Sequence, residues 1–223
     1  NNDNAIRKVF HYPKRGYIYD RNDSLLVANQ PSYDVMVIPR EVEPLDTLMF
    51  CNLLKIDKLS FLKYYKRAKR YSPRLPSVFL PHLSKEDYAF LSEKLRKFKG
   101  FYIQKRSVRD YQTSIGANVL GYIAEANPKD LKKDSYYILG DLIGKQGVEI
   151  SYEKTLRGIK GVKYIQKDIY NRDIGAYKEG AFDTLPVPGK DLKITIDSEL
   201  QSYGELLMQN KIGGIVAIEP SSG

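Results

Sequence analysis

The chain has 223 residues, of which 42% are hydrophobic and 28% are charged, a composition typical of a globular protein with a substantial core. No apolar run approaches the roughly 18 residues needed to cross a bilayer, no signal-peptide pattern opens the chain, and the single cysteine, Cys51, rules out a disulfide framework. The formal net charge of +9 keeps nucleic acid and anionic membrane surfaces open as partners.

The first organised stretch is residues 15–29, which predicts a β-hairpin. Short β-favouring runs at 17–19 and 25–28 flank residues 20–24, whose Asp, Asn and Ser side chains favour turns. The preceding residues 1–14 are polar and mixed, so we expect an extended or poorly ordered lead-in.

Arg15, Asp20 and Arg21 bracket this turn. A planar guanidinium can hold two segments together through paired bonds to carboxylate or backbone oxygens. The alternative on physical grounds alone is an exposed polar turn, because surface ion pairs contribute little stability.

Residues 33–111 alternate between strand and helix patterns. Apolar β-branched runs predict strands, helical apolar spacing predicts helices, and Ser84 is a candidate N-cap. The expected elements are a strand at 33–39, a helix beginning at Pro44, a helix at 57–70, a short strand at 78–80, a helix at 84–100 and a strand at 101–111. This order suggests a small α+β subdomain over residues 40–111.

Basic residues gather in the helix at 57–70 and again at 94–99, interleaved with tyrosines. Stacking aromatics beside cations are what single-stranded nucleic acid requires. A solvated helix face is the alternative, and no nucleic-acid module signature accompanies the charge. A stand-alone basic nucleic-acid-binding protein is therefore the main alternative function.

Glycine-rich motifs follow at 116–122 and 143–158, and the second predicts a helix over 149–157. Glu149, Glu153 and Arg157 are four residues apart and would share one face of that helix.

The remainder predicts short elements and ends in a turn. We expect a strand at 162–169, a polar turn region at 171–180, a linker at 186–191, a strand at 192–197, a helix at 198–210 and a strand at 214–218. Because residues 220–223 form a turn with no strand after it, the chain reads as a fragment.

Several motifs together resemble the N-terminal region of class B penicillin-binding proteins. They are Arg-Gly-x-Ile-x-Asp-Arg-Asn-x-x-Leu-Leu-x-x-Asn at 15–29, Gly-Ala-x-x-Leu-Gly-Tyr at 116–122, Ile-Gly-Lys-x-Gly-Val-Glu at 143–149, Tyr-Glu followed by Leu-Arg-Gly at 152–158, and Thr-Ile-Asp-x-x-Leu-Gln at 195–201. Asn118 stands where the family commonly has histidine. The resemblance covers nearly the whole chain and is weakest over 40–111.

The resemblance implies an α+β fold in three parts. Residues 1–39 and 112–188 would form the pedestal, or dimerisation-type, domain; residues 40–111 an inserted head subdomain; and residues 189–223 the truncated start of a transpeptidase domain. It also suggests a structural network that ties the hairpin to the 149–157 helix, with Glu149 or Glu153 meeting Arg15 or Arg21. The residues of this predicted network are Arg15, Gly16, Asp20, Arg21, Glu149, Glu153 and Arg157.

The function implied by the resemblance is that of a non-catalytic pedestal in an elongation-type peptidoglycan D,D-transpeptidase, acting in cell-wall synthesis and cell shape. The parent would face the periplasm from the inner membrane, anchored by an N-terminal transmembrane helix absent here. Its expected partners are a membrane-embedded SEDS-type glycan polymerase and a rod-complex scaffold protein, with peptidoglycan precursor as substrate, no nucleic acid and no cofactor.

Catalysis in the family uses Ser-x-x-Lys. Ser60 with Lys63 and Ser151 with Lys154 fit this pattern by letter, but both precede the expected start of the transpeptidase domain. The chain is thus expected to hold no catalytic residue, and an independent enzyme using Ser60 or Ser151 is a second alternative. His11 and His82 are too isolated to suggest a triad or a metal site.

Overall fold

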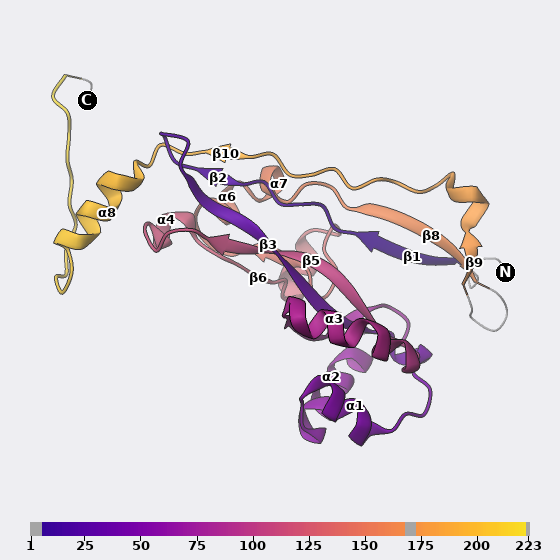
Figure 1. The fold of residues 1–223 in the computed structure, drawn as a ribbon. Coiled ribbons are helices and arrows are strands. Elements are labelled where there is room, and N and C mark those ends of the chain that lie inside the picture. Colours follow the sequence, from indigo (N-terminus) through magenta and orange to yellow (C-terminus); the bar gives the residue numbers. More distant parts are fainter. Residues whose placement is uncertain (1–5, 168–172, 222–223) are drawn as a thin grey trace.

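The structure, a computed structural model, describes residues 6–167 and 173–221 and has the expected mixture of helices and strands (Figure 1). The strands are β1 (Ile6–His11), β2 (Ile18–Tyr19), β3 (Leu25–Val37), β4 (Ser77–Leu83), β5 (Phe101–Tyr111), β6 (Ile123–Glu125), β7 (Leu142–Gly144), β8 (Gly161–Lys167), β9 (Asp173–Ala176) and β10 (Leu192–Lys193). The α-helices are α1 (Thr47–Leu54), α2 (Lys58–Tyr71), α3 (Lys85–Lys94), α4 (Ala117–Leu120), α5 (Pro128–Lys133), α6 (Gly147–Ser151), α7 (Glu153–Leu156) and α8 (Ser198–Leu207). The 3-10 helices are η2 (Pro39–Glu41), η3 (Leu95–Lys97) and η4 (Tyr177–Gly180).

Strand β3 is the central strand of the main sheet. It pairs antiparallel with β5 along almost its whole length, from Val27 opposite Tyr111 to Val37 opposite Phe101, and also with β2 and β4. The predicted hairpin is confirmed as β2, a turn and the start of β3. The sequence predicted separate strands at 25–28 and 33–39, but the chain between them continues the ladder with β5, so they form one strand.

A second sheet, in the order β1-β8-β9, extends as an arm beside β3 and β5 (Figure 1). Strand β1 lies in the expected lead-in and pairs antiparallel with β8. The expected turn region at 171–180 contains strand β9, so the turn prediction is wrong over 173–176. The short 3-10 helix η4, with left-handed backbone at Lys178 and Glu179, turns the chain after it. Residues 168–172, including the end of the strand predicted at 162–169, lie outside the described part.

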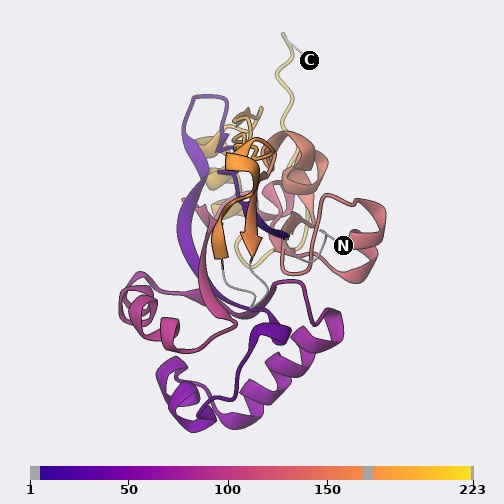
Figure 2. The same ribbon diagram turned by 90° about the vertical axis from the view of Figure 1, so that its right-hand side faces the viewer.

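The region predicted as the head contains α1, α2, α3 and β4, packed on one end of β3 and β5 (Figures 1 and 2). Its core is an aromatic cluster in which Phe50 contacts Phe61, Phe79, Phe98 and Phe101 with ring-centroid distances of 4.4 to 5.9 Å. The buried Cys51 belongs to the same core, as expected.

The helix ends in the head follow from side-chain capping. Asp57 and Ser84 accept hydrogen bonds from backbone N–H groups of the first turns of α2 and α3. The first helix begins at Thr47 rather than at Pro44, because Asp46 is its cap. Helix α3 is shorter than predicted and gives way to η3 before Gly100.

A second core lies under the hairpin. Ile18, Leu26 and Val27 pack there against Leu120 and Leu156. The helix predicted at 149–157 is instead two short helices, α6 and α7, because the backbone leaves helical geometry at Tyr152, with φ −109° and ψ 22°.

The last described segment carries one helix, α8, which agrees with the prediction for 198–210. The predicted strand at 192–197 is reduced to the two residues of β10, which pair parallel with β2. No strand forms at 214–218, where the described residues are exposed and lack a pairing partner. A β-favouring sequence needs such a partner to form a strand.

The division into pedestal, head and residues 189–223 stays a prediction; β3 and β5 both run from the hairpin into the head. Among the described residues, no helix is long and apolar enough to span a membrane.

Candidate functional site

The most strongly connected group of charges is a buried junction made by Arg15, Arg109, Glu149 and Glu153. Arg15 precedes β2, Arg109 lies on β5, and the two glutamates come from α6 and α7. The Arg15 Nε donates to Glu149 Oε2 at 2.8 Å, and its Nη2 donates to Glu153 Oε2 at 2.5 Å. One arginine therefore holds both short helices, whereas the sequence left open which arginine and which glutamate would meet.

Arg109 completes the junction and was missed by the sequence analysis. Its Nε donates to Glu149 Oε1 at 2.6 Å, and its Nη1 donates to the Gly16 carbonyl at 2.7 Å and to Asn29 Oδ1 at 3.0 Å. Asn29 Nδ2 in turn donates to the Arg15 carbonyl at 2.5 Å. The only sequence signal was a cation within a β-favouring run, which is equally typical of a solvated strand face.

A ring of polar groups surrounds Glu153. Tyr137 and the backbone N–H of Gly144 donate to its two carboxylate oxygens at 2.8 and 2.9 Å. Arg157, which the sequence placed in the network, donates to the Tyr137 hydroxyl and to Asp134 Oδ2, each at 2.8 Å. Arg157 therefore reaches the junction through Tyr137 rather than directly.

The four charged side chains of the junction are almost completely buried, so each charge needs a partner within the protein. The side chains of Glu149 and Arg109 are 0% and 1% exposed, and those of Arg15 and Glu153 are each 10% exposed. Burial raises the pKa of Glu153, but the bonds from Arg15 outweigh it and hold that pKa below its ordinary value. Burial lowers the pKa of Arg109, with Glu149 opposing the shift. Two arginines and two glutamates balance in charge, so removing one would leave another buried and uncompensated.

Asp20 belongs to a different joint, at the hairpin turn. Its Oδ1 accepts from the backbone of Asn22 and Ser24, and its Oδ2 accepts from the Ser198 hydroxyl at 2.6 Å. These bonds, led by that from Ser198, lower the pKa of the carboxyl from 3.8 to about 2. The joint fastens the β2-β3 turn to the start of α8.

Arg21 lies in the same joint. Its side chain is exposed, and its backbone N–H donates to the Ile196 carbonyl at 2.8 Å. The described contacts thus direct Asp20 and Arg21 toward residues 196–198, while Arg15 contacts α6 and α7. Whether all seven predicted network residues act as one functional unit stays a prediction.

Gly16 is required where two chain segments cross. Its N–H donates to the Leu156 carbonyl at 2.9 Å, and a Cβ on Gly16 would lie 1.9 Å from the Lys190 carbonyl oxygen. Only glycine permits so close an approach. The crossing holds the lead-in, α7 and residues 188–191 together.

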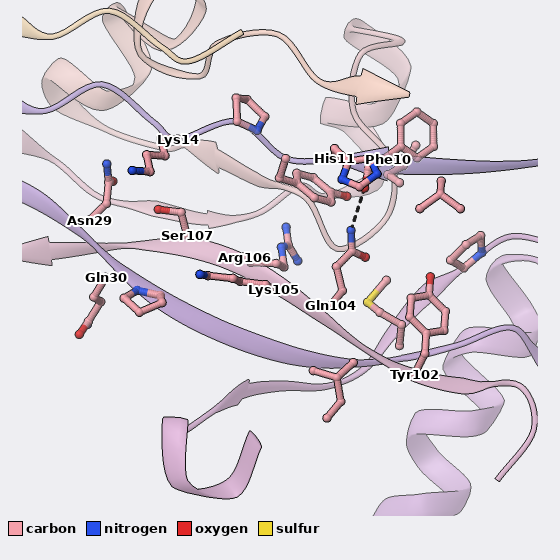
Figure 3. A pocket seen from close by; sticks show the side chains of 18 of the residues that line it. Phe10, His11, Lys14, Asn29, Gln30, Tyr102, Gln104, Lys105, Arg106 and Ser107 are labelled. Carbon is pink, nitrogen blue, oxygen red and sulfur yellow. Dashed lines mark hydrogen bonds between the residues drawn. The ribbon is translucent and has the colours of Figure 1, made fainter. Parts of the chain in front are cut away.

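An open groove of about 740 Å³ lies between β1 with its following segment and the strand pair β3-β5 (Figure 3). Gln104 on β5 spans it and donates to the Phe10 carbonyl at 3.2 Å (Figure 3). Aromatic and apolar side chains line its walls. They include Phe10, Tyr12, Tyr17, Met36, Tyr102 and Ile103.

The groove is cationic. Lys8, Lys14, Lys105 and Arg106 line it, and no carboxylate side chain is among the described residues that do. Arg106 is already bound to Asp34, at 2.9 Å. Lys8, Lys14 and Lys105 are exposed, so they can meet negative charge on a molecule entering the groove.

Neither Ser-x-x-Lys pair lies in this groove. Ser60 is in the first turns of α2, and Ser151 ends α6 and is exposed. His11 lines the groove. His82 lies on β4, and its backbone N–H donates to Asp34 Oδ1 at 2.9 Å. Within the described residues, no group of three His, Cys, Asp or Glu side chains could hold a metal ion.

Comparison with known proteins identifies curated relatives along the whole chain. The peptidoglycan D,D-transpeptidase MrdA of Salmonella typhimurium is 31% identical over 234 residues, which cover 100% of this chain and 36% of that protein. MrdA of Acinetobacter baumannii is 32% identical over 225 residues, covering 99% of this chain and 33% of that protein. The chain thus spans about a third of the length of the curated relatives it matches.

Solved structures share the fold. Penicillin-binding protein PBP2 in its complex with MreC from Helicobacter pylori has a TM-score of 0.71 at 24% identity, covering 92% of this chain and 39% of that one. Penicillin-binding protein 2B from Streptococcus pneumoniae has a TM-score of 0.63 at 15% identity, covering 92% and 43%. The family model of the penicillin-binding protein dimerisation domain matches residues 10–194. The chain therefore belongs to the family of penicillin-binding protein dimerisation domains.

Proposed function

We propose that this chain is the non-catalytic pedestal of an elongation-type peptidoglycan D,D-transpeptidase, similar to PBP2. The parent would be anchored in the bacterial inner membrane, face the periplasm, act on peptidoglycan precursor and maintain cell shape. Similarity to about a third of MrdA, along nearly the whole of this chain, supports the proposal, since that protein is a peptidoglycan D,D-transpeptidase.

The observation that carries the proposal is that motifs far apart in the sequence meet in space. Arg15 of the first motif binds Glu149 and Glu153 of the third and fourth. A Cβ on Gly121 of the second motif would lie 1.9 Å from the Gln146 carbonyl, so these motifs pack backbone against backbone. Motif residues that bond to one another across the chain suit a part of a protein that holds other parts in position.

The pedestal would position the catalytic domain through the Asp20 joint. Asp20 binds Ser198 at the start of α8, and Asn22 Nδ2 donates to Asp197 Oδ2 at 3.2 Å. By the resemblance, these residues lie within 189–223, the truncated start of the transpeptidase domain. A turn held at its own backbone and bonded across to the next domain would limit how that domain tilts.

The groove is the surface that we assign to the rod-complex scaffold protein. A related PBP2 forms a complex with MreC in Helicobacter pylori. The groove offers apolar walls with lysines at its edge, which suits an apolar segment flanked by carboxylates. The membrane-embedded SEDS-type glycan polymerase would contact another part of the pedestal.

Binding of the MreC protein of the same bacterium to the purified chain, measured by biolayer interferometry, tests this assignment. The variant Lys14→Glu/Lys105→Glu should bind at least about tenfold more weakly, because like charges would then face the partner. The control Lys129→Glu/Lys132→Glu makes the same charge change on exposed positions of α5. Equal affinity for both variants, or no binding by the unmodified chain, would reject the assignment.

A further inference from the structure

Helix α2 carries a charged face that no role described above uses. Its outer surface holds five exposed cations and two exposed leucines, and it lies at the free edge of the head (Figures 1 and 2). The cations are Lys58, Lys63, Lys66, Lys69 and Arg70, and the leucines are Leu59 and Leu62. We call these seven residues the outer face of α2.

The cations of the outer face are not neutralised. Among the described residues, none of them takes part in an ion pair, although other head lysines do, as in Lys55 with Asp87 and Lys99 with Glu43. Helix α2 itself contains no acidic residue, and the acid at its N-cap, Asp57, accepts the Ser60 backbone N–H. Like charges this close together repel one another and destabilise the helix.

The leucines distinguish between anionic partners. Leu59 is 77% exposed and Leu62 is 50% exposed, and their three-residue spacing places them on one side among the lysines. The three tyrosines of α2 make other contacts: Tyr65 stacks on Phe61, Tyr64 packs against Phe79, and the Tyr71 hydroxyl accepts from the Leu139 backbone N–H. A single-stranded nucleic acid would need exposed aromatic rings for stacking, whereas a lipid surface takes apolar side chains between cations.

We propose that the outer face of α2 docks the head onto an anionic phospholipid surface. The lysines and Arg70 would lie at the level of the phosphates, and Leu59 and Leu62 would enter the boundary between headgroups and acyl chains. Because the inner face of α2 stays packed in the head core through Phe61 and Ala68, docking needs no unfolding. The attachment would be weak and reversible, and would orient the head relative to the membrane.

Vesicle co-sedimentation of the 223-residue chain tests the proposal. The chain should bind vesicles of phosphatidylglycerol and phosphatidylcholine in equal parts, and not vesicles of phosphatidylcholine alone. The variant Lys63→Glu/Lys66→Glu/Arg70→Glu should lower the partition coefficient at least about tenfold, since each cation near an anionic surface contributes measurably. All three positions are exposed, so the fold should persist, as thermal unfolding by circular dichroism would verify.

Lys129→Glu/Lys132→Glu/Lys133→Glu is the matched control, because it makes the same charge change on exposed positions of α5. It should keep at least half of the binding. The variant Leu59→Ser/Leu62→Ser should still bind anionic vesicles at low salt, because its cations are unchanged. It should lose the binding that the unmodified chain keeps at roughly 300 mM salt, where surface charges are strongly screened.

Equal loss in both triple variants, or no binding to anionic vesicles, would overturn the proposal. Tighter binding to a single-stranded oligonucleotide than to the vesicles would also overturn it and favour the nucleic-acid alternative. None of these results depends on MreC binding, so the outer face and the groove are tested separately.

Discussion

At the scale of single residues, Arg15 is the side chain on which the account depends most. Replacing it with alanine leaves Glu149 buried opposite only Arg109, and leaves Glu153 with neutral donors alone. We expect Arg15→Ala to lower the free energy of unfolding by about 3 to 5 kcal/mol, the usual effect of breaking a buried ion pair from one side. Urea unfolding measures this change.

Arg21→Ala and Lys66→Ala are the controls for Arg15→Ala. Both side chains are exposed, and Arg21 lies in the same hairpin as Arg15. Each should change stability by less than about 0.5 kcal/mol. Three similar urea midpoints would mean that the junction contributes no more than an ordinary surface ion pair.

Asp20 gives a prediction about pH. Its pKa falls from 3.8 to about 2 on folding, chiefly through its bond from Ser198. A carboxyl with a lowered folded pKa stabilises the fold above its unfolded pKa and loses that contribution as pH falls through the folded value. The unmodified chain should therefore have a higher Tm than Asp20→Asn above about pH 4, the ordinary pKa of an aspartate. This difference in Tm should shrink as the pH falls from 3.8 to about 2, the folded pKa of Asp20. A Tm difference that stays constant from about pH 6 down to about pH 2 would count against the Asp20 joint, because this range includes the ordinary pKa of an aspartate.

At the scale of elements, the crossing at Gly16 is the tightest contact between segments. A Cβ there would meet the Lys190 carbonyl oxygen at 1.9 Å, so Gly16→Ala must push residues 188–191 away from the lead-in. We expect a lower Tm and faster hydrogen exchange at the Leu192 N–H, which donates to the Tyr17 carbonyl beside the crossing.

Gly204→Ala provides the opposite expectation. Gly204 lies within α8, and its added Cβ would have no atom within 4 Å. Alanine should therefore stabilise the helix by about 0.5 to 1 kcal/mol through its better helix propensity. If Gly16→Ala left Tm unchanged or raised it, as Gly204→Ala should, the close approach at Gly16 would be refuted.

Local sequence patterns predicted the helices and strands that depend on neighbouring residues in the chain. The capped helices α2 and α3, the β2-β3 hairpin and α8 all follow from side-chain caps, turn residues and helical spacing. Strand β1 was missed because its pairing with β8 joins segments far apart in the chain, which no local pattern records. Strand β9 pairs with the neighbouring β8, but its sequence, Asp-Ile-Gly-Ala, is poor in strand-favouring residues. The reverse holds at 214–218, where a β-favouring run lies without a partner.

The junction was predictable only in part for the same reason. Glu149 and Glu153 drew attention through their spacing, and Arg15 through its motif, yet the break at Tyr152 involves neither glycine nor proline and left no signal. Arg109 reaches Glu149 because β5 pairs with β3 in one particular register, with Asn29 opposite Arg109. That register joins segments far apart in the chain, and a single sequence does not reveal it.

At the scale of the whole molecule, buried polar contacts connect parts that do not share one continuous hydrophobic core. The head core and the core under the hairpin are separate clusters, and β3 passes through both. Arg15 and Arg109 join the hairpin, β5, α6 and α7 at one place, and Asp20 joins the turn to α8. Such a framework suits a protein whose task is to hold other parts at fixed positions.

The central claim, that this chain supports a transpeptidase without performing its chemistry, is tested most directly by labelling it with a fluorescent penicillin. Ser60 and Ser151 each precede a lysine at the required spacing but lie outside the groove. We predict no covalent label on the folded chain at saturating reagent. Stoichiometric labelling that either Ser60→Ala or Ser151→Ala abolishes would contradict the claim and make this chain an enzyme in its own right.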